Sequence, residues 1–440
     1  METKSQNTPP HTVVVGAGLA GLSAAYELLK TGEHRVTVVE ARDRVGGRVH
    51  SVTVDGYGAD LGGFIIYPWY TTYHALLDEL GLESQLQPTP NYDIFYEFGS
   101  KPKEYIADKD IELPVREALS LVQKTLVPIL LDRDVANPRL HDFNHESISQ
   151  YIDGYAKKNN KDLSRLTAFF DLIAQGYCYG DAASWKAAFI APILRQTQLY
   201  GDVKKASVFL QGNNTVPKSL AKKIRDFGGD IILNETVQSI EPGRVTTQHH
   251  TIDCDFIILA QNATPELYAQ AFPSVPKMEW HYTTFITAVI DIGTPALING
   301  SEEWIGMFYE PHPEKPYHMT SATYLGGAYG SLLSGKMTVN IQVNGDAINE
   351  QPLSDDTLYT IVKSEVQGRF PECTDIEIIT AEYWPWTMPI ADELFVEAVR
   401  NAQGENGIFV AGDYLGTPSM ETAVRTGVRA ASAVQERLRK

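Results

Sequence analysis

The first forty residues alternate apolar runs with one amphipathic stretch. Residues 13–15 lie in a continuous apolar run, which is typical of a parallel strand buried on both faces. The segment 35–39, "RVTVV", shows a second such run. Between the two runs, apolar side chains recur three or four residues apart and predict a helix that Gly32 ends: Leu19, Leu22, Tyr26 and Leu29. The pattern therefore predicts a strand–helix–strand unit with parallel strands.

The predicted turn between the first strand and the helix carries Gly16, Gly18 and Gly21 in the GxGxxG spacing. In a dinucleotide-binding fold these glycines allow a tight turn, the close approach of a pyrophosphate, and close helix–strand packing. The helix N-terminus offers free N–H groups and a partial positive charge to the phosphates. Glu40 ends the second predicted strand, where a carboxylate can accept hydrogen bonds from ribose hydroxyls. Together these features predict a dinucleotide-binding domain.

Similar patterns recur in the middle and at the end of the chain. "CDFIILA", at 254–260, predicts another buried strand, and "FITAVIDIG" and "MTVNIQV" predict strands further on. A helix near Pro217 is predicted with one apolar stripe, formed by Leu220, Ile224 and Phe227. "GIFVAGD" predicts a strand and a turn before a last helix, whose apolar face is formed by Val424, Val428, Ala431 and Leu438.

Composition and charge narrow the class of protein. With 440 residues, 43% hydrophobic and 21% charged, the chain is long enough for two or three domains. The formal net charge of −18 disfavours nucleic acid as a partner, because nucleic acid requires clustered positive charge. No apolar run approaches the ~20 residues that span a bilayer, and the first ten residues lack signal-peptide features. We expect a soluble cytoplasmic protein, whose oligomeric state stays open.

The sequence offers little for a disulfide framework or a metal ion. Cys178, Cys254 and Cys373 are far apart, which agrees with a reducing compartment. His141 and His145 lie four residues apart in "HDFNH", but neither an HExxH glutamate nor a clear third ligand accompanies them. We predict no metal site.

The stretch "VVEARDRVGGRVHS" adds a second glycine pair and further arginines directly after Glu40. Together with "GAGLAGLSAAYELLK" it resembles the N-terminal signature of the flavin amine oxidase superfamily, which includes monoamine and polyamine oxidases, protoporphyrinogen oxidase and phytoene-type desaturases. The resemblance implies an α/β fold, with a Rossmann-type FAD-binding domain and an interleaved α+β substrate domain. It implies that Gly46 and Gly47 let the chain pass close to the FAD pyrophosphate and that Arg48 contributes charge there. Arg42 is a further candidate for cofactor binding.

The resemblance continues along most of the chain. "YGADLGGFIIYP" resembles the family segment beneath the isoalloxazine ring, which implies that three residues approach the flavin: Gly62, Gly63 and Phe64. Val237 would hold the adenine edge through its backbone. Asp413, in "GIFVAGDYLGTPSMETAVRTGVRAA", would bind the ribityl chain. The following helix, which begins near Met420, would aim its N-terminus at the flavin C2 carbonyl and stabilise the reduced ring.

In the family the cofactor-binding segments are interrupted by substrate-binding ones. We predict an FAD-binding domain assembled from residues 1–86, 203–270 and 396–440. Residues 87–202 and 271–395 are expected to form the substrate-binding domain, the first with helical patterns and the second mostly with strands.

Aromatic residues are the candidates for the substrate site, because hydride transfer to a flavin needs orientation and a dry pocket. Trp384 and Trp386, in "EYWPWTMP", stand where the family places a segment that faces the flavin. Tyr177 and Tyr179 are weaker candidates, since most aromatic residues simply belong to a core. No catalytic residue is assigned.

The chain departs from many amine oxidases of the superfamily at positions expected near the flavin, among them Ser419, where monoamine oxidases place a tyrosine of their aromatic cage. Many members carry a lysine, bridged by water to flavin N5, on the strand that is here "FITAVIDIG", where Thr287 aligns. Lys336, on a neighbouring predicted strand, is the alternative source of a cation. The aligned segment also lacks the cysteine that attaches flavin covalently, so we expect FAD to bind noncovalently.

The leading hypothesis is an FAD-dependent oxidoreductase that removes a hydride from a small organic substrate, with an amine as the leading substrate class. The alternative is a desaturase or isomerase that acts on a hydrophobic substrate. A third possibility is a non-catalytic binding protein, since the Rab GDP-dissociation inhibitors share this fold and part of the N-terminal signature.

Overall fold

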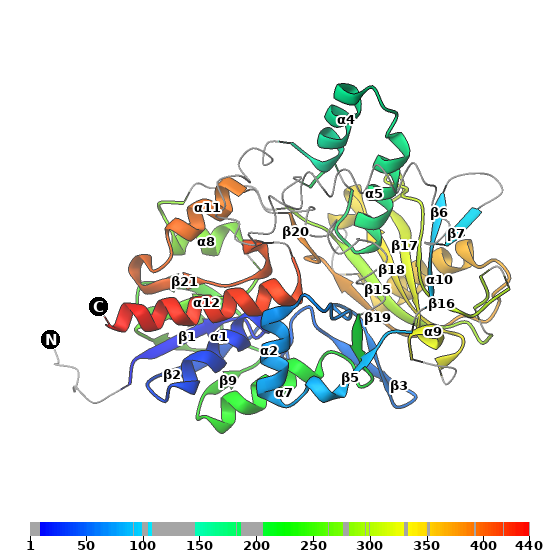
Figure 1. The fold of residues 1–440 in the computed structure, drawn as a ribbon. Helices are drawn as coiled ribbons and strands as arrows, with labels where there is room; N and C mark the ends of the chain where they lie inside the picture. The colour runs from blue at the N-terminus through cyan, green and yellow to red at the C-terminus, as the bar shows by residue number, and fades with distance from the viewer. Residues whose placement is uncertain are drawn as a thin grey trace.

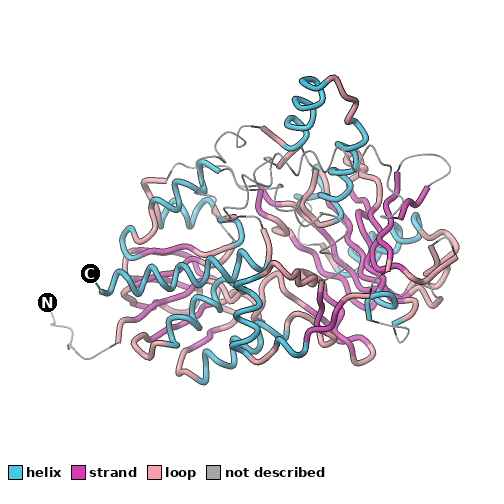
Figure 2. Tube along the Cα trace, viewed as in Figure 1, coloured by secondary structure: helices cyan, strands magenta, loops and turns pink. Residues whose placement is uncertain are grey.

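The computed structural model describes residues 9–90, 92–98, 104–107, 146–181, 183–185, 206–262, 264–275, 281–294, 296–298, 300–329, 333–349, 353–390, 393–416 and 418–439. These residues form two lobes, each built around one sheet (Figure 1). Figure 2 shows the strands of the two sheets on opposite sides of the molecule.

The first lobe contains a five-stranded parallel sheet of order β21-β13-β1-β2-β9. Its inner strands are buried on both faces: Val14, Val38 and Ile258 belong to one apolar core, whereas Val13 and Ile257 belong to the other. This doubly covered parallel sheet confirms the α/β, Rossmann-type prediction. The strands are β1 (His11–Val15), β2 (Arg35–Val39), β9 (Asp230–Ile232), β13 (Phe256–Leu259) and β21 (Ile408–Val410).

Helices cover one face of this sheet, and the last helix of the chain packs along the first (Figure 1). Their contact is close, because a Cβ on Gly427 would lie 2.2 Å from the Ala20 carbonyl oxygen. The helices are α1 (Leu19–Lys30), α2 (Thr71–Leu80), α7 (Thr215–Asp226) and α12 (Met420–Arg439). The opposite face is covered by β10 (Val237–Glu241), β11 (Arg244–Thr247), β12 (Thr251–Asp253), α8 (Pro265–Ala271) and α11 (Glu393–Asn401).

Two residues predicted on apolar helix faces are exposed. Phe227 follows the last residue of α7 and is 47% exposed, with its ring stacked on Tyr26 at 6.0 Å. Leu438 lies in the last turn of α12 and is 44% exposed, because the helix there extends beyond the sheet that it covers. Helical spacing predicts a face of the helix, but the length of that face depends on what packs against it.

The second lobe contains a seven-stranded sheet of order β19-β15-β18-β17-β16-β6-β7. Neighbouring strands are antiparallel except β16 and β6. The strands are β6 (Asp93–Phe98), β7 (Glu104–Ala107), β15 (Phe285–Asp291), β16 (Trp304–Phe308), β17 (Tyr317–Tyr324), β18 (Lys336–Val343) and β19 (Glu377–Trp384).

Helices lie on both faces of this second sheet. On one face, α10 (Asp355–Arg369) packs against Ile286, Ala288 and Ile290. On the other, α5 (Ser164–Gly176) packs against Tyr96 and Phe308. The remaining elements are α4 (Ile148–Asn159), α9 (Leu325–Tyr329), β3 (Ser51–Val54), β4 (Tyr57–Asp60), β5 (Leu86–Pro88), β8 (Ser207–Phe209), β14 (His281–Tyr282) and β20 (Pro389–Ile390).

Candidate active site

Residues of both lobes line one cavity of about 650 Å3. This volume is within the range of about 300–1,000 Å3 that is typical of small-molecule sites. The sequence-predicted residues that line it are Gly16, Gly18, Glu40, Arg42, Gly47, Arg48, Gly62, Gly63, Phe64, Tyr177, Val237, Trp384, Trp386, Asp413 and Met420. The structure therefore brings together, in one place, candidates that lie up to several hundred residues apart in the sequence.

Gly21 is the predicted residue that does not line the cavity. It lies in α1, and a Cβ there would lie 2.0 Å from the Gly16 carbonyl oxygen. This position is the helix–strand packing contact that the third glycine of the motif requires.

The two glycine motifs lie against each other at the N-terminus of α1. Gly18 pairs with Gly46, and the Gly46 N–H donates to the Ala17 carbonyl at 2.8 Å. Gly46 and Gly47 both have positive φ, and a Cβ on Gly47 would lie 3.3 Å from the Gly18 Cα. A Cβ on Gly18 would have no other atom within 4 Å, so the space next to Gly18, between the two glycine motifs, is open. We call these two motifs the glycine cradle. The first turn of α1 contains no acidic residue, and the residues present therefore fit a dinucleotide phosphate.

Glu40 connects the two motifs. Its carboxylate accepts hydrogen bonds from the backbone N–H groups of Ala17, at 2.7 Å, and Arg42, at 2.9 Å. A carboxylate has about four acceptor sites, so these two bonds leave capacity for ribose hydroxyls.

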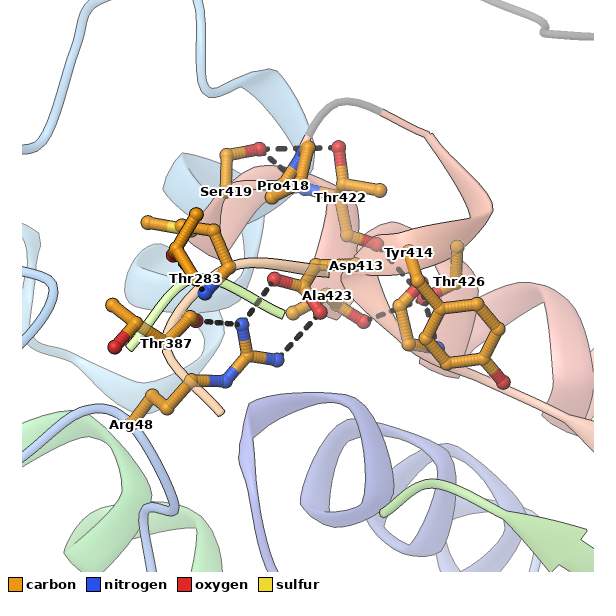
Figure 3. Close-up of polar contacts among 12 residues, drawn as sticks. Arg48, Thr283, Thr387, Asp413, Tyr414, Pro418, Ser419, Thr422, Ala423 and Thr426 are labelled. Atoms are coloured by element: carbon orange, nitrogen blue, oxygen red, sulfur yellow. Dashed lines mark hydrogen bonds and ion pairs between the residues drawn. The ribbon is translucent and has the colours of Figure 1, made fainter. Parts of the chain in front are cut away.

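Arg48 and Asp413, predicted at different parts of the cofactor, are bound to each other (Figure 3). The guanidinium donates to the two Asp413 oxygens at 2.7 and 2.6 Å, and Nη1 also donates to the Thr387 carbonyl at 2.9 Å. Burial disfavours the charge on Arg48, but the carboxylate of Asp413 outweighs it and raises the Arg48 pKa. The pair joins the N-terminal glycine segment to the turn before α12.

Sequence reasoning missed Glu382, on β19. Its carboxylate accepts hydrogen bonds from Arg42 at 2.6 Å, Arg44 at 3.2 Å and His50 Nδ1 at 2.9 Å. Burial alone would raise the Glu382 pKa, but hydrogen bonding and the neighbouring positive charges lower it. The guanidinium carbons of Arg42 and Arg44 lie 5.0 and 5.9 Å from the Trp384 ring centroid. The segment "EARDRVGGRVH" contains more basic than acidic residues. This excess was the available sign that an acidic residue from another part of the sequence would pair with them.

Asp60 was also missed, although it lies within the segment "YGADLGGFIIYP", two residues before Gly62. One of its oxygens accepts from the Ser51 hydroxyl and from the Asn213 N–H, while the other is buried without a partner. Burial raises the Asp60 pKa to about 7, opposed by these two hydrogen bonds. Asn213 in turn donates to the Gly63 and Phe64 carbonyls at 3.1 and 2.6 Å. The network therefore holds the segment expected beneath the flavin ring.

Aromatic side chains form another part of the cavity wall, including three tyrosines that sequence reasoning did not single out: Tyr67, Tyr70 and Tyr329. Burial raises the pKa of Tyr177 and Tyr179, so both hydroxyls stay protonated. Tyr179 donates to the Pro418 carbonyl at 2.6 Å. Trp384 is 4% exposed, whereas Trp386 is 50% exposed and marks a place where the cavity reaches solvent.

Neither lysine nor histidine occurs among the described residues that line the cavity. Thr287 lies in the wall and donates to the Asn340 Oδ1 at 2.9 Å. Lys336, the alternative cation, lies outside the wall and is paired with Asp291 at 2.9 Å and Asp55 at 3.1 Å. The structure therefore does not support Lys336 as a substitute for the family lysine.

His141 and His145 lie outside the described residues. Within the ranges that are described, no group of three or more His, Cys, Asp or Glu side chains could hold a metal ion. No helix of the described part of the chain combines the length and the apolar character needed to cross a membrane.

Sequence comparison finds relatives among the amine and amino acid oxidases. A segment of 72 residues is 58% identical to the putrescine oxidase of Kocuria rosea and covers 16% of this chain and 15% of that protein. A segment of 297 residues is 24% identical to an L-amino acid oxidase of Crotalus durissus cumanensis and covers 62% of this chain and 57% of that protein. The matches thus span less than two thirds of either relative.

Solved structures share the fold over nearly their whole length. A putrescine oxidase bound to putrescine has a TM-score of 0.69 at 20% identity, covering 97% of this chain and 99% of that chain. Cyclohexylamine oxidase from Brevibacterium oxydans has a TM-score of 0.71 at 18% identity, covering 98% and 100%. A fatty acid isomerase from P. acnes also has a TM-score of 0.71, at 15% identity, covering 98% and 99%. At these identities the likeness establishes the fold alone.

A protein-family model also matches the chain. The model is described as flavin containing amine oxidoreductase, and it matches residues 19–435. Because this match covers nearly the whole chain, the protein belongs to the family of flavin-containing amine oxidoreductases.

Proposed function

We propose that the protein is an FAD-dependent oxidoreductase that takes a hydride from a small organic substrate, with an amine as the leading substrate class. Family membership makes it a flavin enzyme and sets aside the non-catalytic alternative. The observation that carries the finer proposal is the cavity of about 650 Å3, whose lining joins the glycine cradle to an aromatic wall. Such a wall can hold an organic group beside a flavin and exclude water.

The residues of the cavity suggest how FAD is held. The α1 N-terminus, Gly47 and Arg48 would bind the pyrophosphate, and Glu40 would bind the ribose. The other contacts expected from the family would be made by Val237 at the adenine, Asp413 at the ribityl chain, and Gly62, Gly63, Phe64 and Met420 around the ring. Bound there, the flavin supplies the hydride acceptor.

The chain's own contribution to the chemistry is orientation and the exclusion of water. Tyr67, Tyr70 and Tyr177 offer apolar ring surfaces with protonated hydroxyls, because burial raises the pKa of each. No residue is assigned as an acid or base.

We expect Glu40→Ala to weaken FAD binding roughly tenfold or more, because a charged acceptor and its ribose hydrogen bonds are removed. Flavin fluorescence quenching on titration of apoprotein measures the affinity. Glu27→Ala, in α1 and away from the cavity wall, where Glu27 is paired with Lys30 at 2.9 Å, is the matched control. Equal FAD affinity in Glu40→Ala and wild type would contradict the assignment of Glu40.

We expect FAD to be bound noncovalently, because no cysteine stands in the family attachment segment. Acid or heat precipitation should release all the flavin into the supernatant. Flavin that stays with the precipitated peptide would contradict this expectation.

Anaerobic bleaching of the flavin tests the proposed function directly. A panel of primary amines and hydrophobic alkenes is mixed with the holoprotein without oxygen. Loss of the visible flavin band with one or more amines supports the proposal. A response to none of the amines overturns the amine assignment.

The cavity wall around Thr287 favours a second candidate function, a dehydrogenase, desaturase or isomerase. Family oxidases are thought to use a lysine and its water to help reduced flavin react with oxygen, and no lysine lines the described wall. We therefore expect slow reoxidation by air and faster reoxidation by a quinone. Stopped-flow measurement on the photoreduced enzyme decides this, with Lys336→Met as the comparison. Rapid reoxidation by air that Lys336→Met slows sharply would restore an ordinary oxidase.

We also propose a cytoplasmic location, supported by three free cysteines, which agree with a reducing compartment. The division into an FAD-binding and a substrate-binding domain, with the ranges predicted above, is likewise a proposal. It is supported by the five parallel strands, all of which come from the ranges assigned to FAD binding.

A further inference from the structure

A row of polar side chains crosses four strands of the seven-stranded sheet. Thr287 on β15 pairs with Asn340 on β18 and with Glu382 on β19, and Asn340 pairs with Ser321 on β17. Directly paired residues project from the same face of a sheet. Ile286 and Ala288 project from the opposite face, toward α10. The row therefore lies on the face that contributes Thr287 and Asn340 to the cavity wall.

The hydrogen bonds along this row have one direction. The Ser321 hydroxyl donates to the Gly176 carbonyl at 2.9 Å, and a carbonyl can only accept. Ser321 therefore accepts from the Asn340 Nδ2 at 3.0 Å, which turns the Asn340 Oδ1 toward Thr287. Since that oxygen also only accepts, the Thr287 hydroxyl must donate its proton to it, at 2.9 Å. The Gly176 carbonyl thus sets the orientation of Ser321, Asn340 and Thr287.

Thr287 therefore donates its only hydroxyl proton to Asn340, within the cavity wall, and this proton is not available to a ligand. A threonine hydroxyl has one donor and two acceptor lone pairs, so Thr287 can offer only acceptor capacity to the cavity. Its oxygen is also the first member of a chain of hydrogen bonds, which polarise one another. Glu382 does not compete for a ligand there, because it does not line the cavity and its carboxylate accepts from Arg42, Arg44 and His50.

We propose that Thr287 is a substrate-positioning residue that accepts a hydrogen bond from an N–H or O–H group of the ligand. The wall then favours amines and alcohols, which can donate a hydrogen bond to Thr287. It disfavours ligands that place a hydrogen-bond acceptor there, such as a carbonyl oxygen. An acceptor-only group would face the lone pairs of Thr287 and would lose its own hydration without a new partner. The inference deepens the proposed function and rests on it in placing the substrate in this cavity.

Two small probes of nearly equal size test the selection without turnover. Cyclopentanol carries a donor, whereas cyclopentanone carries only an acceptor, and both can be titrated into holoprotein while the visible flavin spectrum is followed. We expect wild type to bind the alcohol about three- to tenfold more tightly than the ketone, the effect of one neutral hydrogen bond. Equal affinities, or tighter binding of the ketone, would overturn the proposal.

Variants of the row separate this role from general stability. Thr287→Val is expected to abolish the preference for the alcohol, and Thr287→Ser to retain it. Thr320→Val removes a buried hydroxyl from the same sheet that bonds the Asn340 backbone and does not line the cavity, so it should keep the preference. A preference that survives in Thr287→Val contradicts the assignment.

Asn340→Ala gives the sharpest test, because it removes the acceptor that holds the Thr287 proton. That proton then becomes available to the cavity, and the relative affinity for cyclopentanone should rise. Suppose that Asn340→Ala binds flavin normally but its affinity for cyclopentanone relative to cyclopentanol does not rise. This result would show that Asn340 does not fix the direction in which the Thr287 hydroxyl donates. These affinities do not depend on amine oxidation. If no amine bleaches the flavin but the variants behave as expected, the proposed function fails and the selection by Thr287 stands.

Discussion

Replacement of Arg48 by methionine is expected to lower the free energy of unfolding by about 3 kcal/mol. The change removes the cation that binds both oxygens of Asp413, whose side chain is only 7% exposed. The carboxylate then stays buried without its partner, which costs more than the ion pair contributes. Urea unfolding of the flavin-free protein measures this loss, and flavin content measures the separate effect on cofactor binding.

A double-mutant cycle separates two causes of the lost stability: the unpaired charge of the buried Asp413 carboxylate and the lost packing of the Arg48 side chain. Arg48→Met with Asp413→Asn should recover part of the stability lost in Arg48→Met alone, because no uncompensated charge remains. Arg244 and Asp253, an exposed pair at 2.8 Å on β11 and β12, provide the matched control, for which much smaller changes are expected. Additive effects of the Arg48 and Asp413 changes would contradict a coupled pair.

Replacement of Asp60 by asparagine is expected to change how stability depends on pH. The folded-state pKa of about 7 lies above the usual 3.8, so the stabilisation from protonated Asp60 is complete below about pH 4. It is lost as the pH rises to about 7, because the buried carboxyl must ionise. Between pH 5 and pH 8, Asp60→Asn should therefore gain about 3 kcal/mol relative to wild type. Unfolding titrations at the two pH values measure the gain.

The difference between the two pH values is the decisive quantity. Asparagine keeps the oxygen that accepts from Ser51 and Asn213, and any cost of its buried amide is the same at both pH values. Asp78→Asn, on the exposed side of α2, should show no such gain. A pH-independent effect of Asp60→Asn would mean that Asp60 does not titrate between pH 5 and pH 8, which contradicts a folded-state pKa of about 7.

Local pattern was sufficient for much of the fold. The apolar runs at 13–15 and 35–39 lie in β1 and β2, and the GxGxxG spacing runs from the end of β1 into the first turn of α1. These predictions succeed because a parallel strand must be apolar on both faces and a tight turn needs residues that tolerate positive φ. Phe227 was placed wrongly because periodicity does not show where the neighbouring layer ends.

The candidate site was predicted in part. Arg48 and Asp413 were expected at the cofactor, but their direct pairing was not, because residues 365 positions apart meet only through packing. Asp60 is one residue among many acids in the sequence, and its raised pKa depends on burial between Ser51 and Asn213. No local pattern encodes such an environment.

The sequence by itself determined the positions that need particular backbone conformations, the faces of the main helices, and the family. Tertiary structure alone decided which distant side chains meet: Glu382 with Arg42 and Arg44, and Thr287 with Asn340. The physical reason is that periodicity and glycine spacing reflect interactions between near neighbours in the chain. The direction of a hydrogen-bond row and the partner of a buried charge depend instead on strand register, which the packing of the whole sheet determines.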